Sequence, residues 1–168
     1  IRRKCYCSAM RFSCFHIHEN KKLGGTVTGY RGIETMDKVL LVIPAYNEEK
    51  NIERVVDHIK NDFPELDYVV VNDGSKDDTA AICRRRGYNF IDLPVNLGLA
   101  GCFQTGMKYA WQKGYSYAVQ FDGDGQHRPE YIKSMKEKMD EGYDIVIGSR
   151  FVTEKKSWSM RMFGSRLI

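Results

Sequence analysis

The feature that most constrains the fold is an alternation of two kinds of apolar segment that begins at Met36. Short apolar runs, such as residues 39–43 and 68–71, are separated by longer segments in which apolar residues recur every three or four positions. The short runs have the length of buried strands, and the longer period is that of one helix face. Strands that alternate with helices predict an open, mostly parallel α/β sheet with helices on both faces.

The predicted elements follow one another closely along the chain. We expect a helix over residues 52–63 capped by Asn47, and a second helix capped by Asp77 or Asp78 that ends near Gly87. A further helix is expected at residues 97–113 and another near Pro129, with strands at residues 90–93, 115–121 and 143–147. Ligands of such sheets bind beyond the carboxyl ends of the strands, so the functional residues are expected there.

Composition narrows the class of protein further. A chain of 168 residues suits one domain, and 42% hydrophobic residues are enough for a sizeable core. Residues 1–35 contain seven Lys/Arg and two Asp/Glu, which leaves 19 and 20 for the remainder. Because the remainder is nearly neutral, no nucleic-acid partner is expected. No apolar run approaches the roughly 18 residues that a membrane-spanning helix needs, and the N-terminus shows no secretory signal.

The first 35 residues show neither the helical nor the strand period. We therefore expect residues 1–35 to be a poorly structured leader or upstream translated segment, with residues 36–168 as the domain and Met36 as the biological start. The alternative is a metal site, since CYCSAMRFSCFHIH contains three Cys and two His. Its Cys-x-Cys and His-x-His spacings are tighter than zinc sites use, which disfavours zinc. The odd cysteine total favours a reducing compartment.

The stretch FDGDGQH at residues 121–127 is the strongest local signal. Asp122 and Asp124 leave a predicted strand two positions apart, so both carboxylates can face one cation. Hard cations such as Mg²⁺ and Mn²⁺ prefer oxygen ligands of this kind. A solvated Asp-Gly turn is the alternative. An EF-hand calcium loop is excluded, because His127 and Lys133 stand where that loop needs Gly and Glu.

Two other strand ends are polar, PAYNE at residues 44–48 and NDGSKDDT at residues 72–79. Strand ends of a parallel sheet share one edge, so these motifs and DGDGQH are expected to form one crevice. A carboxylate there can accept a hydrogen bond from a ribose or a base, although Asn, Asp, Gly and Ser are also ordinary turn residues. In NLGLAGCFQTG (residues 96–106), Gly106 is expected to let a helix pack closely on the sheet. That stretch matches neither the GxxxxGK[ST] phosphate loop nor the GxGxxG turn of dinucleotide-binding domains.

Taken together, these motifs resemble the family 2 glycosyltransferases, nucleotide-sugar-dependent enzymes of the GT-A type. The matching stretches are VIPAYNEE, VVVNDGSKDDT, NLGLAGCFQTGMKYA, FDGDGQH and IVIGSRF, in the family's order over about residues 38–151. The motif DGDGQH followed by GSR resembles the sequences of the branch that makes polyprenyl-phosphate sugars, such as the dolichol-phosphate mannose synthases. The resemblance implies a GT-A fold and transfer from a UDP- or GDP-sugar to a polyprenyl phosphate.

The resemblance also implies roles for single residues. The nucleotide-sugar pocket would be lined by Pro44, Ala45, Tyr46, Glu48, Asp73 and Asp122, with Asp73 on the base or ribose. Mg²⁺ or Mn²⁺ would be held by Asp122, Asp124 and Gln126. The acceptor phosphate would be held by Arg150, Arg161 and Ser165. Asp124 and Arg150 would be the catalytic residues.

The implied chemistry is consistent with these residues. Breaking the bond from the sugar to a nucleoside diphosphate leaves charge on the β-phosphate, which a metal ion stabilises. An acceptor phosphate is already ionised and needs no general base. A sugar-hydroxyl acceptor, in surface polysaccharide or glycolipid synthesis, would need a carboxylate base, and residues 150–168 contain no compelling one. A non-catalytic nucleotide-binding module is the other alternative. A sugar-nucleotide pyrophosphorylase would share the sheet, but it is disfavoured because this chain has no glycine-rich start followed by Arg and Pro near Val39.

The last residues suggest where the protein acts. Residues 155–168 combine basic and apolar side chains with Trp158, which suits a membrane surface as well as an ordinary packing helix. We expect a cytoplasmic protein, peripheral at the inner membrane face. Because Ile168 falls inside this predicted helix, the glycosyltransferase domain is expected to be incomplete at its C-terminus. The donor base, the sugar and the oligomeric state are left open.

Overall fold

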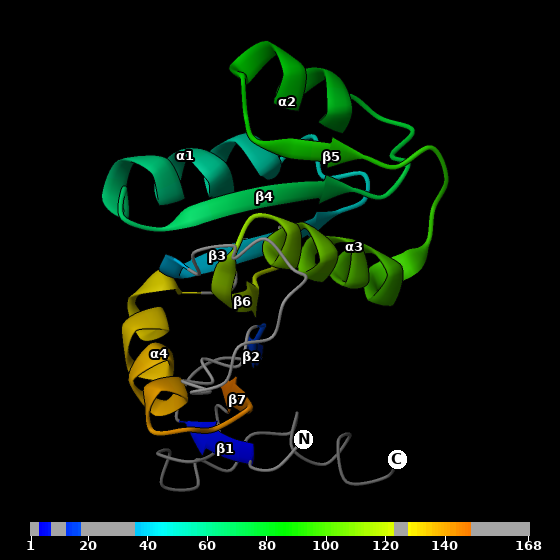
Figure 1. The fold of residues 1–168 in the computed structure, drawn as a ribbon. Helices are drawn as coiled ribbons and strands as arrows, with labels where there is room; N and C mark the ends of the chain where they lie inside the picture. The colour runs from blue at the N-terminus through cyan, green and yellow to red at the C-terminus, as the bar shows by residue number, and fades with distance from the viewer. Residues whose placement is uncertain (1–3, 8–12, 18–35, 123–127, 149–168) are drawn as a thin grey trace, which may run out of the picture.

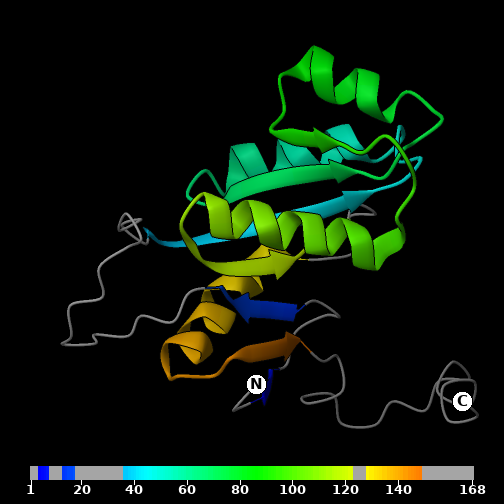
Figure 2. The ribbon, with the colours of Figure 1, turned by 45° about the vertical axis from the view of Figure 1, so that its right-hand side comes forward.

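The fold is a seven-stranded sheet with helices on both faces (Figures 1 and 2), as given by a computed structural model that describes residues 4–7, 13–17, 36–122 and 128–148. The strands are β1 (Lys4–Cys7), β2 (Ser13–His16), β3 (Met36–Ala45), β4 (Asp67–Asn72), β5 (Phe90–Asp92), β6 (Tyr115–Gln120) and β7 (Ile145–Gly148). The helices are α1 (Ile52–Asp62), α2 (Thr79–Arg86), α3 (Gly98–Gln112), the 3₁₀ turn η1 (Pro129–Tyr131) and α4 (Ile132–Asp140).

The strand order is β1-β7-β2-β6-β3-β4-β5. Neighbouring strands are parallel except at β2, which runs antiparallel to both β6 and β7. One core contains residues of α1, α2 and α4, and a second core on the opposite face contains residues of α3. The expected open, mostly parallel α/β sheet is therefore confirmed, and the helices and strands predicted between residues 36 and 147 are all present. The helix predicted near the C-terminus, at residues 155–168, lies outside the described residues.

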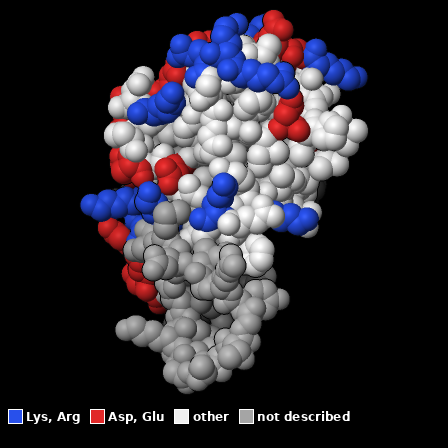
Figure 3. Space-filling model, turned by 45° about the horizontal axis from the view of Figure 1, so that its top comes forward, with Lys and Arg blue, Asp and Glu red and all other residues white. Residues whose placement is uncertain are grey.

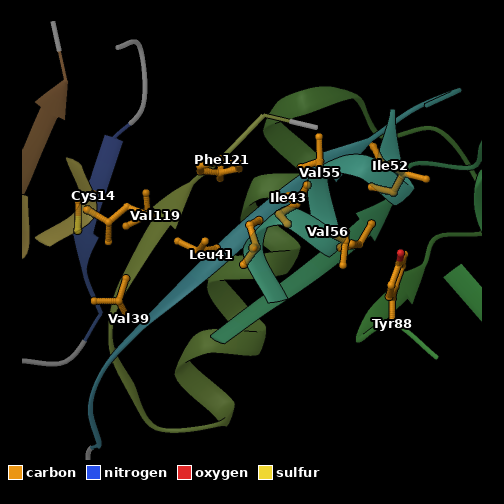
Figure 4. Packing of buried hydrophobic residues seen from close by; sticks show 14 of the residues in the cluster. Cys14, Val39, Leu41, Ile43, Ile52, Val55, Val56, Tyr88, Val119 and Phe121 are labelled. Carbon is orange, nitrogen blue, oxygen red and sulfur yellow. The ribbon is translucent and has the colours of Figure 1, made fainter. Parts of the chain in front are cut away.

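Strand β3 lies inside the sheet, between β6 and β4, and contributes to both cores. Leu41 and Ile43 point to the face covered by α1, where Val56 lies close to them (Figure 4), whereas Leu40 and Val42 point to the face covered by α3. This alternation follows from the two-residue period of a strand. All five side chains are 0% exposed, so β3 is a rigid support for whatever follows its carboxyl end.

Strand β3 continues through Pro44 to Ala45, beyond the apolar run at residues 39–43 from which it was predicted. Strand β3 pairs with β6 only as far as Val42, but with β4 as far as Ala45. The missing N–H of Pro44 falls on the side of β6, where pairing has already ended, so no ladder hydrogen bond is lost.

Helix α3 approaches the sheet closely at Gly106. A Cβ atom placed there would lie 2.2 Å from Cγ1 of Val42, so only glycine fits without displacement. The interpretation of Gly106 as a packing residue is confirmed. Cys102 and Ala110, one turn to either side, are 0% exposed and complete the contact.

The expectation that residues 1–35 are poorly structured is wrong for β1 and β2. Cys14 of β2 pairs with Val119 of β6 on one side and Val146 of β7 on the other, and it is 1% exposed. The ring of Phe15 lies 5.1 Å from that of Phe103 on α3. A strand of four residues is too short to show a period, and one covered on both faces need not alternate. The interpretation of the segment as a leader, and of Met36 as the start, stays a prediction.

The metal-site alternative for this segment gains no support from the described part of the chain. Within it, no group of three His, Cys, Asp or Glu side chains comes together. His18 lies outside the described residues, and Cys14 is buried in the sheet.

Arginines on α2 attach this helix to the rest of the molecule. Arg86 pairs with Asp57 and Glu53 of α1, and Arg84 pairs with Asp92 at the end of β5. Figure 3 shows Lys and Arg side chains gathered at this end of the molecule with acidic side chains beside them.

Among the described residues, no helix has both the length and the apolar character that crossing a membrane requires.

Candidate functional site

Three of the predicted motifs meet at one edge of the sheet. PAYNE begins with the last two residues of β3, NDGS begins with the last residue of β4, and Asp122 comes two residues after β6. These three strands are parallel neighbours with β3 in the middle. Figure 1 shows the arrowheads of β3, β4 and β5 directed to the same side. The described residues predicted to bind the nucleotide sugar therefore share this edge: Pro44, Ala45, Tyr46, Glu48, Asp73 and Asp122.

Five predicted residues cannot be placed in this way. Asp124 and Gln126 of the metal site lie outside the described residues, as do Arg150, Arg161 and Ser165 of the acceptor site. Their proposed roles stay predictions.

Asn47 joins the loop after β3 to the loop after β4. Its backbone N–H donates to Oγ of Ser75 at 2.9 Å, and its side-chain Oδ1 accepts the backbone N–H of Lys76 at 2.9 Å. The backbone of Asn47 is left-handed, with φ of 56°, a conformation that Asn tolerates better than most residues. The expectation that Asn47 caps α1 is wrong, since the N-cap position is Asn51.

Glu48 is held by the same arrangement. Its backbone N–H donates to Oγ1 of Thr79 at 2.9 Å, while its carboxylate accepts a hydrogen bond of 2.8 Å from the side chain of Asn51. Its carbonyl accepts the N–H groups of Asn51 and Ile52, which starts α1. Glu48 therefore connects the sheet edge to the helix, and its predicted contact with the nucleotide stays a prediction.

Asp77 closes the connection between the two loops. Its carboxylate accepts the backbone N–H of Glu49 at 3.0 Å, and both the N–H and the hydroxyl of Thr79, at 3.0 and 2.6 Å. Burial of the carboxylate opposes ionisation, but the hydrogen bonds from Thr79 and Glu49 prevail and lower the pKa of Asp77. The prediction that Asp77 or Asp78 caps α2 is consistent with this, although Asp78, at the N-cap position, makes no side-chain cap hydrogen bond.

Asp73 lies below the start of α3. Its two carboxylate oxygens accept the backbone N–H groups of Leu97 and Gly98, at 2.6 and 2.9 Å, and the residue is only 3% exposed. Cys102, one turn further along α3, is also close. Burial, together with a hydrogen bond to Asp73, raises the pKa of the Cys102 thiol to about 12. The predicted contact of Asp73 with a base or ribose stays a prediction.

The residues on either side of Asp73 contact the same loop. Asn72 is 1% exposed; its carbonyl accepts the N–H of Leu93 at 2.9 Å and its side chain donates to Asp92 at 2.6 Å. Gly74 has φ of 64°, and a Cβ there would lie 2.9 Å from the carbonyl carbon of Val95. Sequence reasoning missed this role, because it interpreted NDGS as turn residues or as a contact for a ribose or base. The buried Asn-Asp pair at a strand end was the available signal.

The exposed part of the edge is formed by Tyr46 and Asp122. Tyr46 is 45% exposed directly after β3, so one face of its ring can stack on a flat ligand. Asp122 is half-buried and accepts a hydrogen bond of 3.2 Å from the side chain of Gln120. A carboxylate at this point, followed in sequence by Asp124 and Gln126, is a donor set of hard oxygens that fits Mg²⁺ or Mn²⁺.

A cavity of about 390 Å³ lies on the α1 side of the sheet, and Phe121, the residue before Asp122, is one of the residues that line it. The buried ring of Phe121 contributes to its wall. Its charged and polar lining comes from Arg54 and His58 of α1 and from Arg128 and Glu130, which follow the DGDGQH stretch. The edge is thus acidic and amide-rich at its centre, with guanidinium groups to one side.

The fold and the sheet edge define an α/β domain with a polar site at the carboxyl ends of its strands. The model of the family described as "Glycosyl transferase family 2" matches residues 40–165, which include every motif at this edge. The chain belongs to this family.

Relatives with printed activities point to one branch of the family. The polyprenol monophosphomannose synthase of Mycolicibacterium smegmatis is 30% identical over 126 residues, covering 71% of this chain and 48% of the relative. The UDP-N-acetylglucosamine–dolichyl-phosphate N-acetylglucosaminyltransferase of Methanococcus voltae is 35% identical over 143 residues, covering 74% and 57%. The chain spans about half the length of the curated relatives it matches.

Among solved structures, the mannosyltransferase PcManGT from Pyrobaculum calidifontis in complex with GDP-Man and Mn²⁺ is similar to 56% of this chain and to 31% of its own. The two are 23% identical, with a TM-score of 0.44. This similarity is too low to assign a ligand to any residue of the chain.

Proposed function

We propose that this chain is the sugar-transferring part of a polyprenyl-phosphate glycosyltransferase, which moves a sugar from a nucleoside diphosphate to a lipid phosphate. The observation that carries the proposal is the meeting of PAYNE, NDGS and Asp122 at one sheet edge in a family 2 domain. The printed names of the relatives support the lipid acceptor, since they include polyprenol, dolichyl and undecaprenyl phosphate transferases.

The donor is proposed to lie across the ends of β3, β4 and β6. Tyr46, which is 45% exposed, would offer its ring to the base, and Pro44, Ala45 and Glu48 would line the rest of the pocket. Asp122 would face the diphosphate and, with Asp124 and Gln126, hold Mg²⁺ or Mn²⁺. When bound, this ion would stabilise the charge that develops on the leaving diphosphate.

The acceptor phosphate is proposed to bind beyond β7. Strands β6 and β7 are both antiparallel to β2, so their carboxyl ends lie at the same edge of the sheet. In the sequence, Arg150 comes two residues after the end of β7, just as Asp122 comes two residues after the end of β6. With Arg161 and Ser165, Arg150 would hold the phosphate through charge-assisted hydrogen bonds. Attack from the face opposite the leaving group would invert the sugar carbon, and an ionised phosphate needs no general base.

The protein is proposed to act at the cytoplasmic face of the inner membrane as a peripheral protein. The basic and apolar composition of residues 155–168 supports this location, as does the lipid chemistry of the relatives' printed acceptors.

The proposal is tested in two steps on the full chain. Calorimetric titration with GDP-mannose and UDP-glucose, each with Mn²⁺ and with a chelator, should show metal-dependent binding of one nucleotide class. Sugar transfer is then measured to a short-chain polyprenyl phosphate and to a free sugar. Transfer to the free sugar alone would replace the lipid acceptor with a hydroxyl acceptor, and binding without any transfer would favour a non-catalytic module.

A matched pair of variants makes the first step specific. Asp122→Asn should weaken metal-dependent nucleotide binding, whereas Asp78→Asn, an exposed carboxylate on the neighbouring loop, should not. Equal effects of the two substitutions would contradict the proposed location of the diphosphate.

A further inference from the structure

A row of hydrogen bonds runs across the ends of three neighbouring strands. Asp92 at the end of β5 accepts a hydrogen bond of 2.6 Å from the side chain of Asn72 at the end of β4. The side-chain oxygen of Asn72 accepts a hydrogen bond of 2.5 Å from the hydroxyl of Ser75. The Ser75 oxygen accepts the backbone N–H of Asn47, just after β3, at 2.9 Å. The ends of β5, β4 and β3 are therefore joined by this row as well as by backbone pairing.

Asn72 is the fixed centre of this row. Its side chain is 1% exposed, and both ends of its amide are used, because the nitrogen donates to Asp92 and the oxygen accepts from Ser75. Asp92 is held at its other oxygen by Arg84 of α2. A buried amide in this state cannot turn without losing a hydrogen bond. The hydroxyl of Ser75 therefore donates in a fixed direction, and its oxygen is available to accept the N–H of Asn47.

We propose that Ser75 is a positioning residue, which holds the backbone after β3 so that the ring of Tyr46 forms one wall of the donor crevice. The importance of this wall for the reaction rests on the proposed function, in which Tyr46 offers its ring to the base. The placement of Tyr46 by Ser75 does not rest on it, because the placement concerns contacts within the chain.

The first argument is the backbone on either side of Tyr46. Ala45, the last residue of β3, is 2% exposed, and its carbonyl accepts a backbone hydrogen bond of 2.8 Å from the loop after β4. Asn47 lies beyond the strand in the left-handed conformation, with φ of 56°, which is higher in energy than the usual conformations. Such a conformation persists where surrounding contacts hold it. The contacts here are the Ser75 oxygen and the backbone N–H of Lys76.

The second argument is the exposure of the ring. Tyr46 is 45% exposed, so packing against the protein fixes its ring only in part, and the backbone has to do the rest. An aromatic ring stacks well on a flat group only within a narrow range of distances and tilts. A shift of the backbone at Asn47 would therefore weaken contact with the base, while Asp122, where the diphosphate is proposed to lie, stays in place. Ser75 should affect nucleotide affinity more than the chemical step.

Amide exchange in the native full chain tests the structural part of the inference. Ser75→Ala removes the acceptor for the N–H of Asn47, so exchange at this amide should rise by about tenfold or more. Ser75→Thr retains the hydroxyl and should keep the rate of the parent chain. Asp78→Asn, which changes an exposed carboxylate three positions further on, should also leave the Asn47 amide unchanged.

Leu41 in the middle of β3 supplies the reference amide, because it is 0% exposed. If Ser75→Ala also speeds exchange at Leu41, that variant is destabilised globally, and Ser75→Cys decides the question. Cysteine has nearly the shape of serine, but its sulfur is a weak acceptor. The Asn47 amide alone should then exchange faster. Parent-like exchange at Asn47 in the folded variants that lack the hydroxyl would overturn the inference.

A double-mutant cycle tests whether Ser75 acts through Tyr46. With GDP-mannose or UDP-glucose, whichever binds the parent chain, Ser75→Ala should weaken binding by up to about tenfold, the scale of one aromatic contact. It should raise KM and leave kcat largely unchanged, and Ser75→Thr should retain the parent affinity. In a Tyr46→Ala background, Ser75→Ala should have little further effect. Additive losses would show that Ser75 acts on the donor by another route, and would overturn the inference.

The two measurements separate this inference from the proposed function. If the parent chain binds neither nucleotide, the proposed function fails, and exchange at the Asn47 amide still decides whether Ser75 holds this backbone. If the parent chain binds a nucleotide and Ser75→Ala weakens binding while the Asn47 amide stays protected, the proposed function stands and the positioning role of Ser75 is wrong.

Discussion

Cys14 of β2 lies opposite Val119 of β6 and, on its other side, opposite Val146 of β7. Among the strands that the structure describes, β2 is the only connection between β7 and the large parallel part of the sheet. The position of β7 matters for function, because the predicted phosphate-binding residue Arg150 follows it. A short strand near the N-terminus is therefore part of the framework of the proposed acceptor site.

Replacing Cys14 tests whether β2 is seated in the sheet. Cys14→Asp places a carboxylate in a position that is 1% exposed, and it should lower the free energy of unfolding by about 3 kcal/mol. Cys14→Ala removes only a sulfur atom and should cost about 1 kcal/mol. Urea unfolding followed by circular dichroism measures both. Equal stability of Cys14→Asp and the parent chain would contradict the insertion of β2.

The thiol of Cys14 reports the same property without a substitution. Burial raises the pKa of Cys14 to about 12, so the thiol stays protonated at neutral pH while β2 is in place. Labelling of Cys14 in the native state should therefore be slow. Any condition that speeds amide exchange in β7 should also speed the labelling of Cys14.

The sequence predicted the part of the fold that repeats a local pattern. Residues 39–43 and the helix around Val55 and Val56 could be recognised because their apolar side chains recur with the period of the structure they form. Strand β2 could not be recognised, because its place between β6 and β7 depends on residues about a hundred positions away.

The candidate site divides in the same way. The convergence of Tyr46, Asp73 and Asp122 at one edge follows from the topology of parallel strands, so the motifs alone predicted it. The hydrogen bonds of Asn47 and Asp73 to other loops were not predicted. A polar residue in a loop has many possible partners, and only the fold determines which of them it meets.

Asn47 should be sensitive to substitution through its backbone as well as its side chain. Asn47→Ala removes the acceptor for the N–H of Lys76 and places Ala at φ of 56°, so we expect a loss of about 1–2 kcal/mol of stability. Asn47→Gly loses the acceptor but adopts this φ freely, and should cost less. Asn47→Asp keeps both properties and serves as the control. Thermal unfolding of the three variants gives the order, and a Gly variant less stable than the Ala variant would contradict it.

Asp77 should make stability depend on pH in the acidic range. Its folded-state pKa is lowered, because hydrogen bonds from Thr79 and Glu49 outweigh the effect of burial. A lowered pKa means that the stabilisation is fully present above the unfolded-state value of about 4 and is lost as the pH falls through the folded-state value. Urea unfolding from neutral pH down to about pH 3 should therefore show a shallower loss in Asp77→Asn than in the parent chain.

The matched control for Asp77 is Asp78→Asn, an exposed carboxylate that is the next residue along the chain. It should keep the acid dependence of the parent chain. Identical pH profiles for Asp77→Asn and the parent chain would show that the hydrogen bonds to Asp77 contribute nothing to folding.

Asp124 provides the sharpest test of the proposed chemistry. If Asp124 holds the ion that stabilises the leaving diphosphate, Asp124→Asn should lower turnover by about a hundredfold or more, by analogy with the loss of one transition-state contact. A chelator should abolish transfer by the parent chain, and added Mn²⁺ should restore it. The variant should need more Mn²⁺ than the parent chain to reach its own maximum rate, because one carboxylate ligand has become a neutral amide. Near-normal turnover of Asp124→Asn at low Mn²⁺ would reject the assignment of this carboxylate to the metal, whereas the same loss in Asp78→Asn would reveal only a general effect of charge at the sheet edge.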